Sequence, residues 1–428
     1  MLKAGVRGEM GTGTHGIPRV AYVLLWFPRA SETFVFREVC ALRDLGLPIH
    51  IYTMYGSGMR GCSESMRAYK GSLTRFGSSA LGRIMWAFFK ELFRRPAHTF
   101  ALMRRCLLRR MRDWETVGEN SWCFFAGFAL ADLARRDGIE LLHSPWANGP
   151  CTAVWVASQL TDIPFAFTGR AGDMYPPDGL LREKLADCLF VRTNTAANVD
   201  YLVSHAPAGD EDKIVLVYNA LTLPRELPAK ATADPPYKIL AVGRFARTKG
   251  FACLMTAMAR LKRESFPCRL TLVGDGWLRV ALRNLRARLQ LEDCVSMPGF
   301  VPHDGMLALL ESHHMLAAPC VVTETGDRDG IPNVIIEALS QGVPVVSTNV
   351  SGIGEIVLNN KTGILIEQRD PRALAEAIRT LATNRQQALA MAEAGKRLVR
   401  RMFNPQTNIQ ALYALYVERF NAMRRPER

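Results

Sequence analysis

Long apolar runs are missing from this sequence. No stretch approaches the roughly 18 consecutive apolar residues with which a helix spans a bilayer. The opening residues, MLKAGVRGEMGTGTHG, also lack the apolar core of a signal peptide. We therefore expect a protein that is neither exported by such a signal nor integral to a membrane.

Metal-ligand clusters and paired cysteines are missing too. The ten cysteines are scattered without a C-x-x-C pair, and no histidines have the spacing of metal ligands. A zinc site and a disulfide framework are therefore disfavoured. We expect a protein of the reducing cytoplasm with no bound metal.

Acidic residues are too few to balance the basic ones. Lys and Arg number 54 against 40 Asp and Glu, a formal charge of +14 at pH 7. Such a surplus predicts an anionic partner, which could be nucleic acid, a lipid surface or a phosphorylated substrate. No nucleic-acid recognition motif is present, so we do not expect nucleic-acid binding.

Strand-like and helix-like segments alternate along the whole chain. With 48% hydrophobic residues, 428 residues can fill two cores. The pattern predicts an α/β fold of two doubly wound, Rossmann-like domains. The first series of predicted strands is VAYVLLWF, PIHIYTM, ELLHSPW, PFAFTG, CLFVRT and KIVLVYN, and the second is KILAVGRF, RLTLVGDG, VSMPGF, HMLAAP, VPVVST and GILIE.

A segment rich in Pro and Ala separates the two series and predicts the domain boundaries. We expect an N-terminal domain over 1–222, a linker over 223–237 and a C-terminal domain over 238–401. The last segment, 402–428, has apolar residues at helical spacing and is expected to form a helix that returns to the first domain.

Residues 81–115 combine nine Lys or Arg with many large apolar side chains. Basic helices with bulky apolar residues are typical of proteins that bind an anionic membrane surface. The alternative is a pair of ordinary helices with a buried apolar face and solvated arginines. We favour membrane contact.

Two glycine-rich stretches are candidates for a phosphate-binding loop, and only the second has the position that such a loop needs. GTGTHG, at 11–16, matches G-x-G-x-x-G but precedes the first strand, whereas the phosphate-binding mechanism needs the glycines after it, so we reject it. AVGRFARTKGF places Gly243, Arg244 and Lys249 directly after a predicted strand. That is the ligand edge of an open α/β sheet, and the two cations suit a diphosphate.

The stretch DGIPNVIIEALS predicts the start of a helix near Pro332, with exposed amides and the positive end of the helix dipole over 330–334. Helical geometry puts Glu337 and Ser340 on the face opposite the apolar one. Asp329 and Glu337 then bracket an anion site and can accept hydrogen bonds from hydroxyl groups. This arrangement fits a nucleotide sugar.

At these residues the chain resembles the retaining glycosyltransferases of family 4, whose GT-B fold has two facing Rossmann-like domains and a cleft between them. The ordered motifs are AVGRFARTKGF, LVGDGWLR, MPGFVP, DGIPNVIIEALSQGVPVVST, SGIGEIV and NNKTGILI. In the first half, WFPRASETFVFREV and HSPWANGPCTAVWVASQLTDIPFAFTG look like the bacterial exopolysaccharide branch of colanic acid type.

The resemblance implies a role for each matching residue. Arg244 and Lys249 would bind the donor diphosphate, Glu337 the ribose and Asp329 the sugar; Asp329 stands where the family has a glutamate. Two further sets are implied. Donor-binding residues would be Gly243, Gly299, Phe300, Val301, Gly330, Ile331, Pro332, Asn333 and Val334, with 299–301 beside the nucleotide base. The acceptor side of the cleft would include Ser31, Glu32, Thr33 and Asp173.

One departure concerns a residue expected to face the donor sugar. Relatives carry a His in an A-H-G-x-D run, whereas this chain has TGRAGDMY, which puts Arg170 there and keeps Asp173. An arginine can bond a sugar hydroxyl or a developing phosphate charge, but it cannot act as a base near neutral pH. We include Arg170 among the candidate catalytic residues.

The implied function is metal-independent transfer of a sugar from a nucleotide diphosphate sugar, without a further cofactor, to a saccharide acceptor. In this branch we expect a lipid-linked acceptor and a protein peripheral to the inner face of the cell membrane. The alternative is a non-catalytic nucleotide-sugar-binding scaffold of the same fold. A GT-B phosphorylase is disfavoured because we find no context for a pyridoxal-phosphate lysine.

Overall fold

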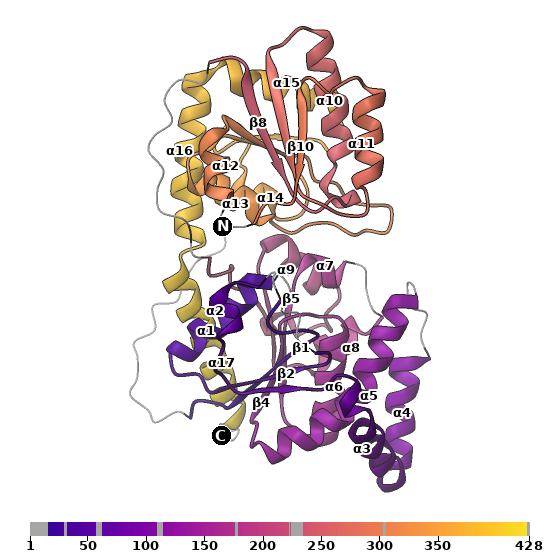
Figure 1. The fold of residues 1–428 in the computed structure, drawn as a ribbon. Coiled ribbons are helices and arrows are strands. Elements are labelled where there is room, and N and C mark those ends of the chain that lie inside the picture. Colours follow the sequence, from indigo (N-terminus) through magenta and orange to yellow (C-terminus); the bar gives the residue numbers. More distant parts are fainter. Residues whose placement is uncertain are drawn as a thin grey trace.

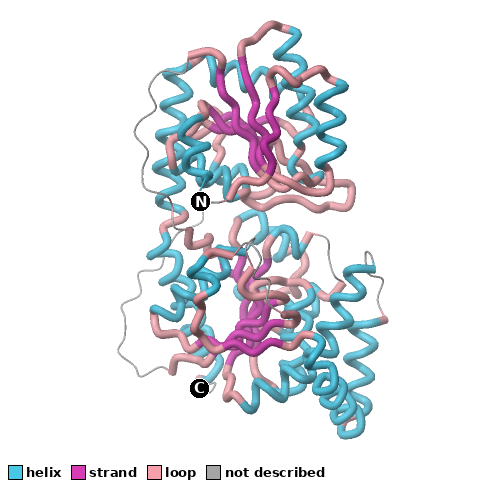
Figure 2. The backbone as a smooth tube through the Cα atoms, in the orientation of Figure 1, coloured by secondary structure: helices cyan, strands magenta, loops and turns pink. Residues whose placement is uncertain are grey.

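Two parallel β-sheets, one in each domain, organise the chain (Figure 2). A computed structural model describes residues 16–29, 32–56, 62–108, 114–175, 179–221, 223, 234–302 and 305–425. The first sheet contains β1 (Val20–Leu24), β2 (Ile49–Thr53), β3 (Leu73–Arg75), β4 (Leu141–Ser144), β5 (Phe165–Gly169), β6 (Phe190–Thr193) and β7 (Ile214–Leu216). The second contains β8 (Tyr237–Val242), β9 (Cys268–Val273), β10 (Val295–Gly299), β11 (Met315–Ala318), β12 (Val345–Thr348) and β13 (Ile364–Ile366).

The strand orders confirm the predicted doubly wound α/β fold. They run β3-β2-β1-β4-β5-β6-β7 in the first sheet and β10-β9-β8-β11-β12-β13 in the second. The order reverses between β1 and β4 and again between β8 and β11. Ligands of open α/β sheets bind outside the carboxyl ends of the strands at such a reversal.

Helices cover both sheets (Figure 1). Those of the first domain are α1 (Thr33–Asp44), α2 (Glu64–Arg67), α3 (Leu81–Arg94), α4 (Pro96–Leu107), α5 (Trp114–Arg136), α6 (Gly149–Thr161), α7 (Ala171–Met174), α8 (Leu181–Asp187) and α9 (Ala196–Val203). Those that follow are α10 (Phe251–Arg263), α11 (Arg279–Arg288), α12 (Met306–Ser312), α13 (Asn333–Ser340), α14 (Ile353–Ile356), α15 (Pro371–Thr383), α16 (Arg385–Met402) and α17 (Pro405–Arg424).

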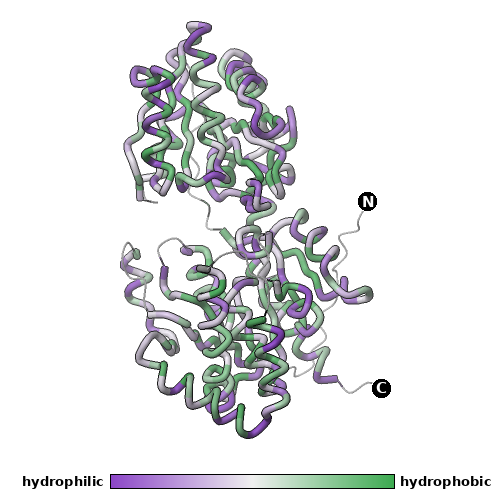
Figure 3. The backbone as a smooth tube through the Cα atoms, turned by 90° about the vertical axis from the view of Figure 1, so that its right-hand side faces the viewer, coloured by the Kyte–Doolittle hydropathy of each residue, from purple (hydrophilic) through white to green (hydrophobic). Residues whose placement is uncertain are grey.

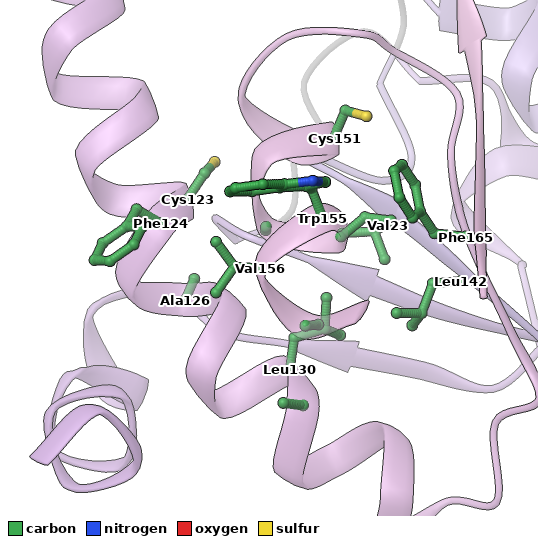
Figure 4. Close-up of a cluster of buried hydrophobic side chains, with 14 of the residues drawn as sticks. Val23, Cys123, Phe124, Ala126, Leu130, Leu142, Cys151, Trp155, Val156 and Phe165 are labelled. Atoms are coloured by element: carbon green, nitrogen blue, oxygen red, sulfur yellow. The ribbon is translucent and has the colours of Figure 1, made fainter. Parts of the chain in front are cut away.

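One core cluster of the first domain lies between its sheet and helices α5 and α6. Figure 4 shows the Trp155 ring of α6 among side chains of α5 and of the strands. Gly127 of α5 allows the two helices to approach closely, since a Cβ atom at this position would lie only 2.7 Å from Cβ of Val156 in α6. Figure 3 shows hydrophobic residues concentrated inside each domain and hydrophilic ones on the outer helices. Each domain therefore has a core of its own.

Helix α17 connects the two domains in a second way. It follows α16 of the second domain and runs onto the first domain (Figure 1). There Leu412, Tyr416 and Phe420 are buried in the same cluster as residues of β1, β2 and α1. The predicted linker falls mostly outside the described residues, and β8 begins at its predicted last residue, Tyr237.

Helices α3 and α4 are the predicted basic helices. Their inner faces are core, since Ile84, Phe88 and Leu102 are buried against the first domain. Their outer faces nevertheless leave Phe93 84% exposed and Trp86 72% exposed. The buried face fits the alternative of ordinary covering helices, and contact of the exposed rings with a membrane stays a prediction. Of its arginines, 109, 110 and 112 lie outside the described residues.

Candidate functional site

The loop after β8 carries the first two candidate residues. A Cβ atom on Gly250, whose φ is +63°, would lie 1.9 Å from the carbonyl oxygen of Pro319, so only glycine lets this loop pack against the end of β11. Gly243 leaves room for the Lys249 side chain, since a Cβ atom there would lie 3.2 Å from Cε of Lys249. The loop therefore presents Lys249 beside the strand-order reversal, while Arg244 is exposed.

Lys249 forms an ion pair with Asp329. Its Nζ atom donates to Oδ1 of Asp329 at 3.0 Å, and both side chains are largely buried. Burial, the largest single influence, would lower the pKa of Lys249, but attraction to Asp329 and Cys320 together with the hydrogen bond to Asp329 leaves that pKa raised. The charge of Arg244 opposes this rise. The structure thus brings Lys249 and Asp329 into contact, and Arg244 is an exposed residue of the same loop.

Helix α13 holds Glu337. The helix begins at Asn333, with Pro332 as the residue that precedes it. Burial raises the pKa of Glu337 to about 7, and the charge of Arg37 in α1 opposes that rise. Ser340 was expected on the exposed face with Glu337, but it is fully buried and donates to the Glu337 carbonyl oxygen at 2.7 Å. That expectation was wrong because α16 covers this part of α13, where Arg400 bonds the Ser340 carbonyl oxygen.

The first domain forms the opposite wall of the site. A Cβ atom on Gly330 would lie 3.6 Å from Ala171 and 3.7 Å from Thr195, so the Asp329–Gly330 segment is close to the loops after β5 and β6. The guanidinium of Arg328 lies 3.8 Å from the centre of the Tyr175 ring. The carboxyl ends of the two sheets therefore face each other across this segment.

A further contact joins the domains at α14. The Glu355 carboxylate accepts a hydrogen bond from the Ala197 amide of α9 at 3.2 Å and another from the Tyr218 hydroxyl at 2.8 Å. Burial raises the pKa of Tyr218, and the hydrogen bond to Glu355 and the negative charge of that carboxylate raise it further. Glu355 was not among the predicted site residues, because nothing in the SGIGEIV stretch indicates a partner in the other domain.

Arg170 lies inside the first domain. Its guanidinium donates to the Pro145 carbonyl oxygen at 3.3 Å and to Asn219 Oδ1 at 3.0 Å, and it lies 3.8 Å from Oε2 of Glu38. It also stacks over the Phe34 ring at 4.7 Å. These contacts make Arg170 a partner of a buried carboxylate. The predicted bond to a donor sugar stays a prediction that this geometry does not favour.

Asp173 anchors the loop after β5. Its carboxylate accepts from the backbone amides of Arg170 at 2.8 Å and Ala147 at 2.5 Å, and burial raises its pKa to about 7. Nearer the start of α1, Glu32 pairs with Arg29 at 3.1 Å. Thr33 is the first residue of α1, and Ser31 lies outside the described residues.

The segment predicted to lie beside the nucleotide base follows β10. Gly299 ends this strand with φ +97°, which favours glycine. Phe300 is 74% exposed, and Val301 is partly buried against the core beneath β11 and α13. Their contact with a base stays a prediction.

Two Rossmann-like domains with facing carboxyl edges define the GT-B class, and comparison with known proteins agrees. Residues 236–384 match the family described as glycosyl transferases group 1. WcaL of Escherichia coli K12, assigned as a colanic acid biosynthesis glycosyltransferase, is 35% identical over 389 residues, 84% of this chain and 89% of that protein. The amylovoran biosynthesis glycosyltransferase AmsK of Erwinia amylovora is 32% identical over 40% of this chain and 42% of that protein.

Solved structures share the fold at low identity. HepE of Anabaena in complex with UDP-glucose has a TM-score of 0.64 at 16% identity and covers 93% of this chain and 99% of that one. Sucrose-phosphate synthase of Thermosynechococcus elongatus has a TM-score of 0.67 at 18% identity and covers 94% and 99%. The chain belongs to the group 1 glycosyltransferase family, which confirms the resemblance seen in the sequence.

Proposed function

We propose that this protein is a family 4, retaining glycosyltransferase that moves a sugar from a nucleotide diphosphate sugar to a lipid-linked saccharide in exopolysaccharide or other cell-surface glycan synthesis. The observation that carries the proposal is the group formed by Lys249, Asp329 and nearby Arg244 at the start of α13. The names of WcaL and AmsK, and the UDP-glucose in the HepE structure, support the pathway and the donor class.

The chemistry follows from where charge develops. The bond between the sugar and the diphosphate breaks, the acceptor oxygen bonds the same face of the sugar, and the acceptor proton passes to the departing phosphate. Lys249, Arg244 and the amides before α13 would stabilise the charge on the leaving diphosphate. In this proposal they do so without a metal, and the reaction uses no side-chain base.

The ion pair of Lys249 with Asp329 suggests an order of events. An incoming diphosphate competes with Asp329 for the lysine, because a phosphate carries more charge and more acceptor oxygens than one carboxylate. The released carboxylate can then accept hydrogen bonds from sugar hydroxyls. Asp329 is one methylene shorter than the usual glutamate, so its choice of hydroxyl would differ from that of relatives.

We also propose that the protein works at the cytoplasmic face of a membrane, bound through α3 and α4. The exposed side chains of Trp86 and Phe93 lie on helices that also carry Arg94, Arg104 and Arg105. Apolar rings together with basic residues suit an anionic bilayer surface. No helix among the described residues is long and apolar enough to cross a membrane.

The function is tested by donor binding followed by transfer. A thermal-shift panel of UDP-, GDP- and dTDP-sugars should identify a stabilising donor, and product analysis should then show transfer with retained anomeric configuration. Lys249→Ala should lower turnover by roughly 10²-fold or more, the effect of removing one donor that stabilises an oxyanion. Lys262→Ala is the matched control, because Lys262 pairs with Asp293 at 2.6 Å on the surface.

Each outcome separates the alternatives. Unchanged transfer by Lys249→Ala would refute the diphosphate role of this lysine. A donor that binds without any transfer or hydrolysis would favour the non-catalytic binding protein.

A further inference from the structure

A cavity of about 510 Å³ lies in the second domain, between α10, α11 and residues 321–324. It is separate from the Lys249 and Asp329 side chains, neither of which lines it. Binding sites for small molecules typically measure about 300–1,000 Å³ and are mostly apolar with a few placed polar groups. The size of this cavity is therefore that of a ligand site.

The lining of the cavity is apolar inside and cationic outside. Phe251, Leu282 and Val321 are less than a tenth exposed and form part of the inner wall. The charged lining residues are Arg247, Arg288 and Arg369, with Glu324 as the single acid. A ligand that matches both parts has an apolar body and an anionic end.

We propose that this cavity binds a small amphipathic anion, namely an alkyl or acyl chain that ends in a phosphate or a carboxylate. The rim arginines are not equivalent. Arg247 stacks over the Trp277 ring at 5.5 Å, and Arg369 donates to the Val322 carbonyl oxygen at 2.6 Å. Among the described residues Arg288 forms no hydrogen bond, ion pair or ring contact, so its whole guanidinium is available to an anionic head group, and Arg247 keeps its in-plane N–H groups for the same purpose.

The cavity shares its walls with the segments that carry the donor-site residues. The Val321 amide donates to the Thr248 carbonyl oxygen at 2.9 Å, directly before Lys249. Residues 321–324 then lead into Asp329. A ligand in this cavity would therefore contact both the segment that leads to Lys249 and the segment that leads to Asp329. The proposal does not depend on the sugar transfer itself.

Cys253, a partly exposed lining residue, offers a direct readout. The purified full-length protein is alkylated with N-ethylmaleimide at mildly alkaline pH, because burial raises the pKa of this thiol to about 11. Peptide mass spectrometry then follows each cysteine separately. Decyl phosphate, below its micelle concentration, should slow alkylation of Cys253 in a saturable way and leave the partly exposed Cys40 and Cys294 unaffected.

Further probes define the ligand. Decanoate in place of decyl phosphate distinguishes a fatty acid from a lipid phosphate as the better ligand, and saturable protection by either supports the site. Decanol tests the head group and inorganic phosphate tests the chain. Equal protection by decanol or by inorganic phosphate would overturn the proposal, as would the absence of protection by both amphipathic anions.

Two variants locate the binding to this cavity. Ala281→Trp should fill the cavity and abolish protection, whereas Ala287→Trp, an exposed position on the same helix that does not line it, should leave protection intact. Arg288→Gln should weaken protection by decyl phosphate roughly two- to fivefold, the range of an exposed ion pair, without changing that by decanol. Protection that survives in both Ala281→Trp and Arg288→Gln would place the ligand elsewhere and refute the site.

Discussion

Glu337 should make donor binding depend on pH. Its pKa of about 7 reflects burial, so the side chain changes charge near neutrality. The carboxylate can accept a hydrogen bond from ribose on each of its two oxygens, whereas one oxygen of the protonated acid becomes a donor. We therefore predict that affinity for UDP or GDP rises by about tenfold or less between roughly pH 6 and pH 8. Calorimetric titrations at each pH measure this rise.

The comparison variant for this prediction is Glu337→Gln. This variant should bind UDP or GDP more weakly than the unchanged protein at the higher pH. Its affinity should also depend less on pH, because the titrating carboxyl group is gone. If its affinity changed with pH as much as before, Glu337 would not be the group responsible.

The effect of Glu337 on folding stability has the opposite dependence on pH. Since the folded pKa lies above the ordinary value of 4.5 for a glutamate, the unfolded chain releases its proton first, and this residue lowers stability progressively as pH rises from about 4.5 to about 7.

Single residues also show what sequence alone could reach. Gly243, Lys249 and Asp329 were predictable as neighbours because they follow strands on either side of a strand-order reversal. Arg170 was predictable in position but not in contacts. Its partner Glu38 is far away in sequence, and nothing in TGRAGDMY indicates that the side chain turns towards a buried carboxylate.

At the scale of the element, Glu355 of α14 stabilises α9 of the other domain. A carboxylate at a helix start satisfies an amide that has no partner within the helix and interacts favourably with the helix dipole. We predict that Glu355→Ala lowers the free energy of unfolding by about 1–2 kcal/mol. Urea titrations measure the change.

A matched control for that prediction is Glu393→Ala. Glu393 forms an exposed ion pair with Arg397 within α16, and such pairs contribute about 0.5 kcal/mol or less. If the two substitutions lowered the free energy of unfolding equally, the contact between α14 and α9 would stabilise the protein no more than an exposed ion pair does.

Helices α3 and α4 give the prediction about membranes. Phe93→Ser combined with Trp86→Ser should reduce sedimentation with vesicles that contain anionic lipid, because each ring loses its apolar contact with the bilayer. Arg104→Gln with Arg105→Gln should reduce it as well, by about 1 kcal/mol per charge, and added salt should erase that difference. Gly82→Ser is the control, since a side chain there would meet open space.

Binding that is unchanged in both double variants would leave α3 and α4 as ordinary covering helices. The sequence alone could not tell which aromatic side chains of α3 are buried, because this helix has apolar residues on several sides and Phe88 and Phe93 are equally apolar. Only the packing of α3 against α5 decides that Phe88 is core and Phe93 is not.

At the scale of the whole molecule, the site combines parts that are distant in sequence. The strand and helix series predicted two domains, and the structure confirms them as a GT-B fold. The contacts across the domains, such as Arg328 with Tyr175 and Glu355 with Ala197, depend on how the domains face each other. Local periodicity carries no information about that orientation.

Helix α17 ties the end of the chain to the first domain. Tyr416 is fully buried, and its hydroxyl donates to the Tyr22 hydroxyl at 3.3 Å, which in turn donates to Glu38 at 2.7 Å. Glu38 pairs with Arg192 at 2.7 Å. Removing the Tyr416 ring would therefore open a cavity beside a buried charge pair.

We predict that Tyr416→Ala lowers the free energy of unfolding by about 3–5 kcal/mol, the cost of truncating a buried aromatic residue. Gln410→Ala, at an exposed position of the same helix, should change it by about 0.5 kcal/mol or less. Urea titrations followed by tryptophan fluorescence measure both. If Tyr416→Ala were as mild as Gln410→Ala, α17 would rest on the first domain without stabilising it, and the first domain would owe its stability to its own helices alone.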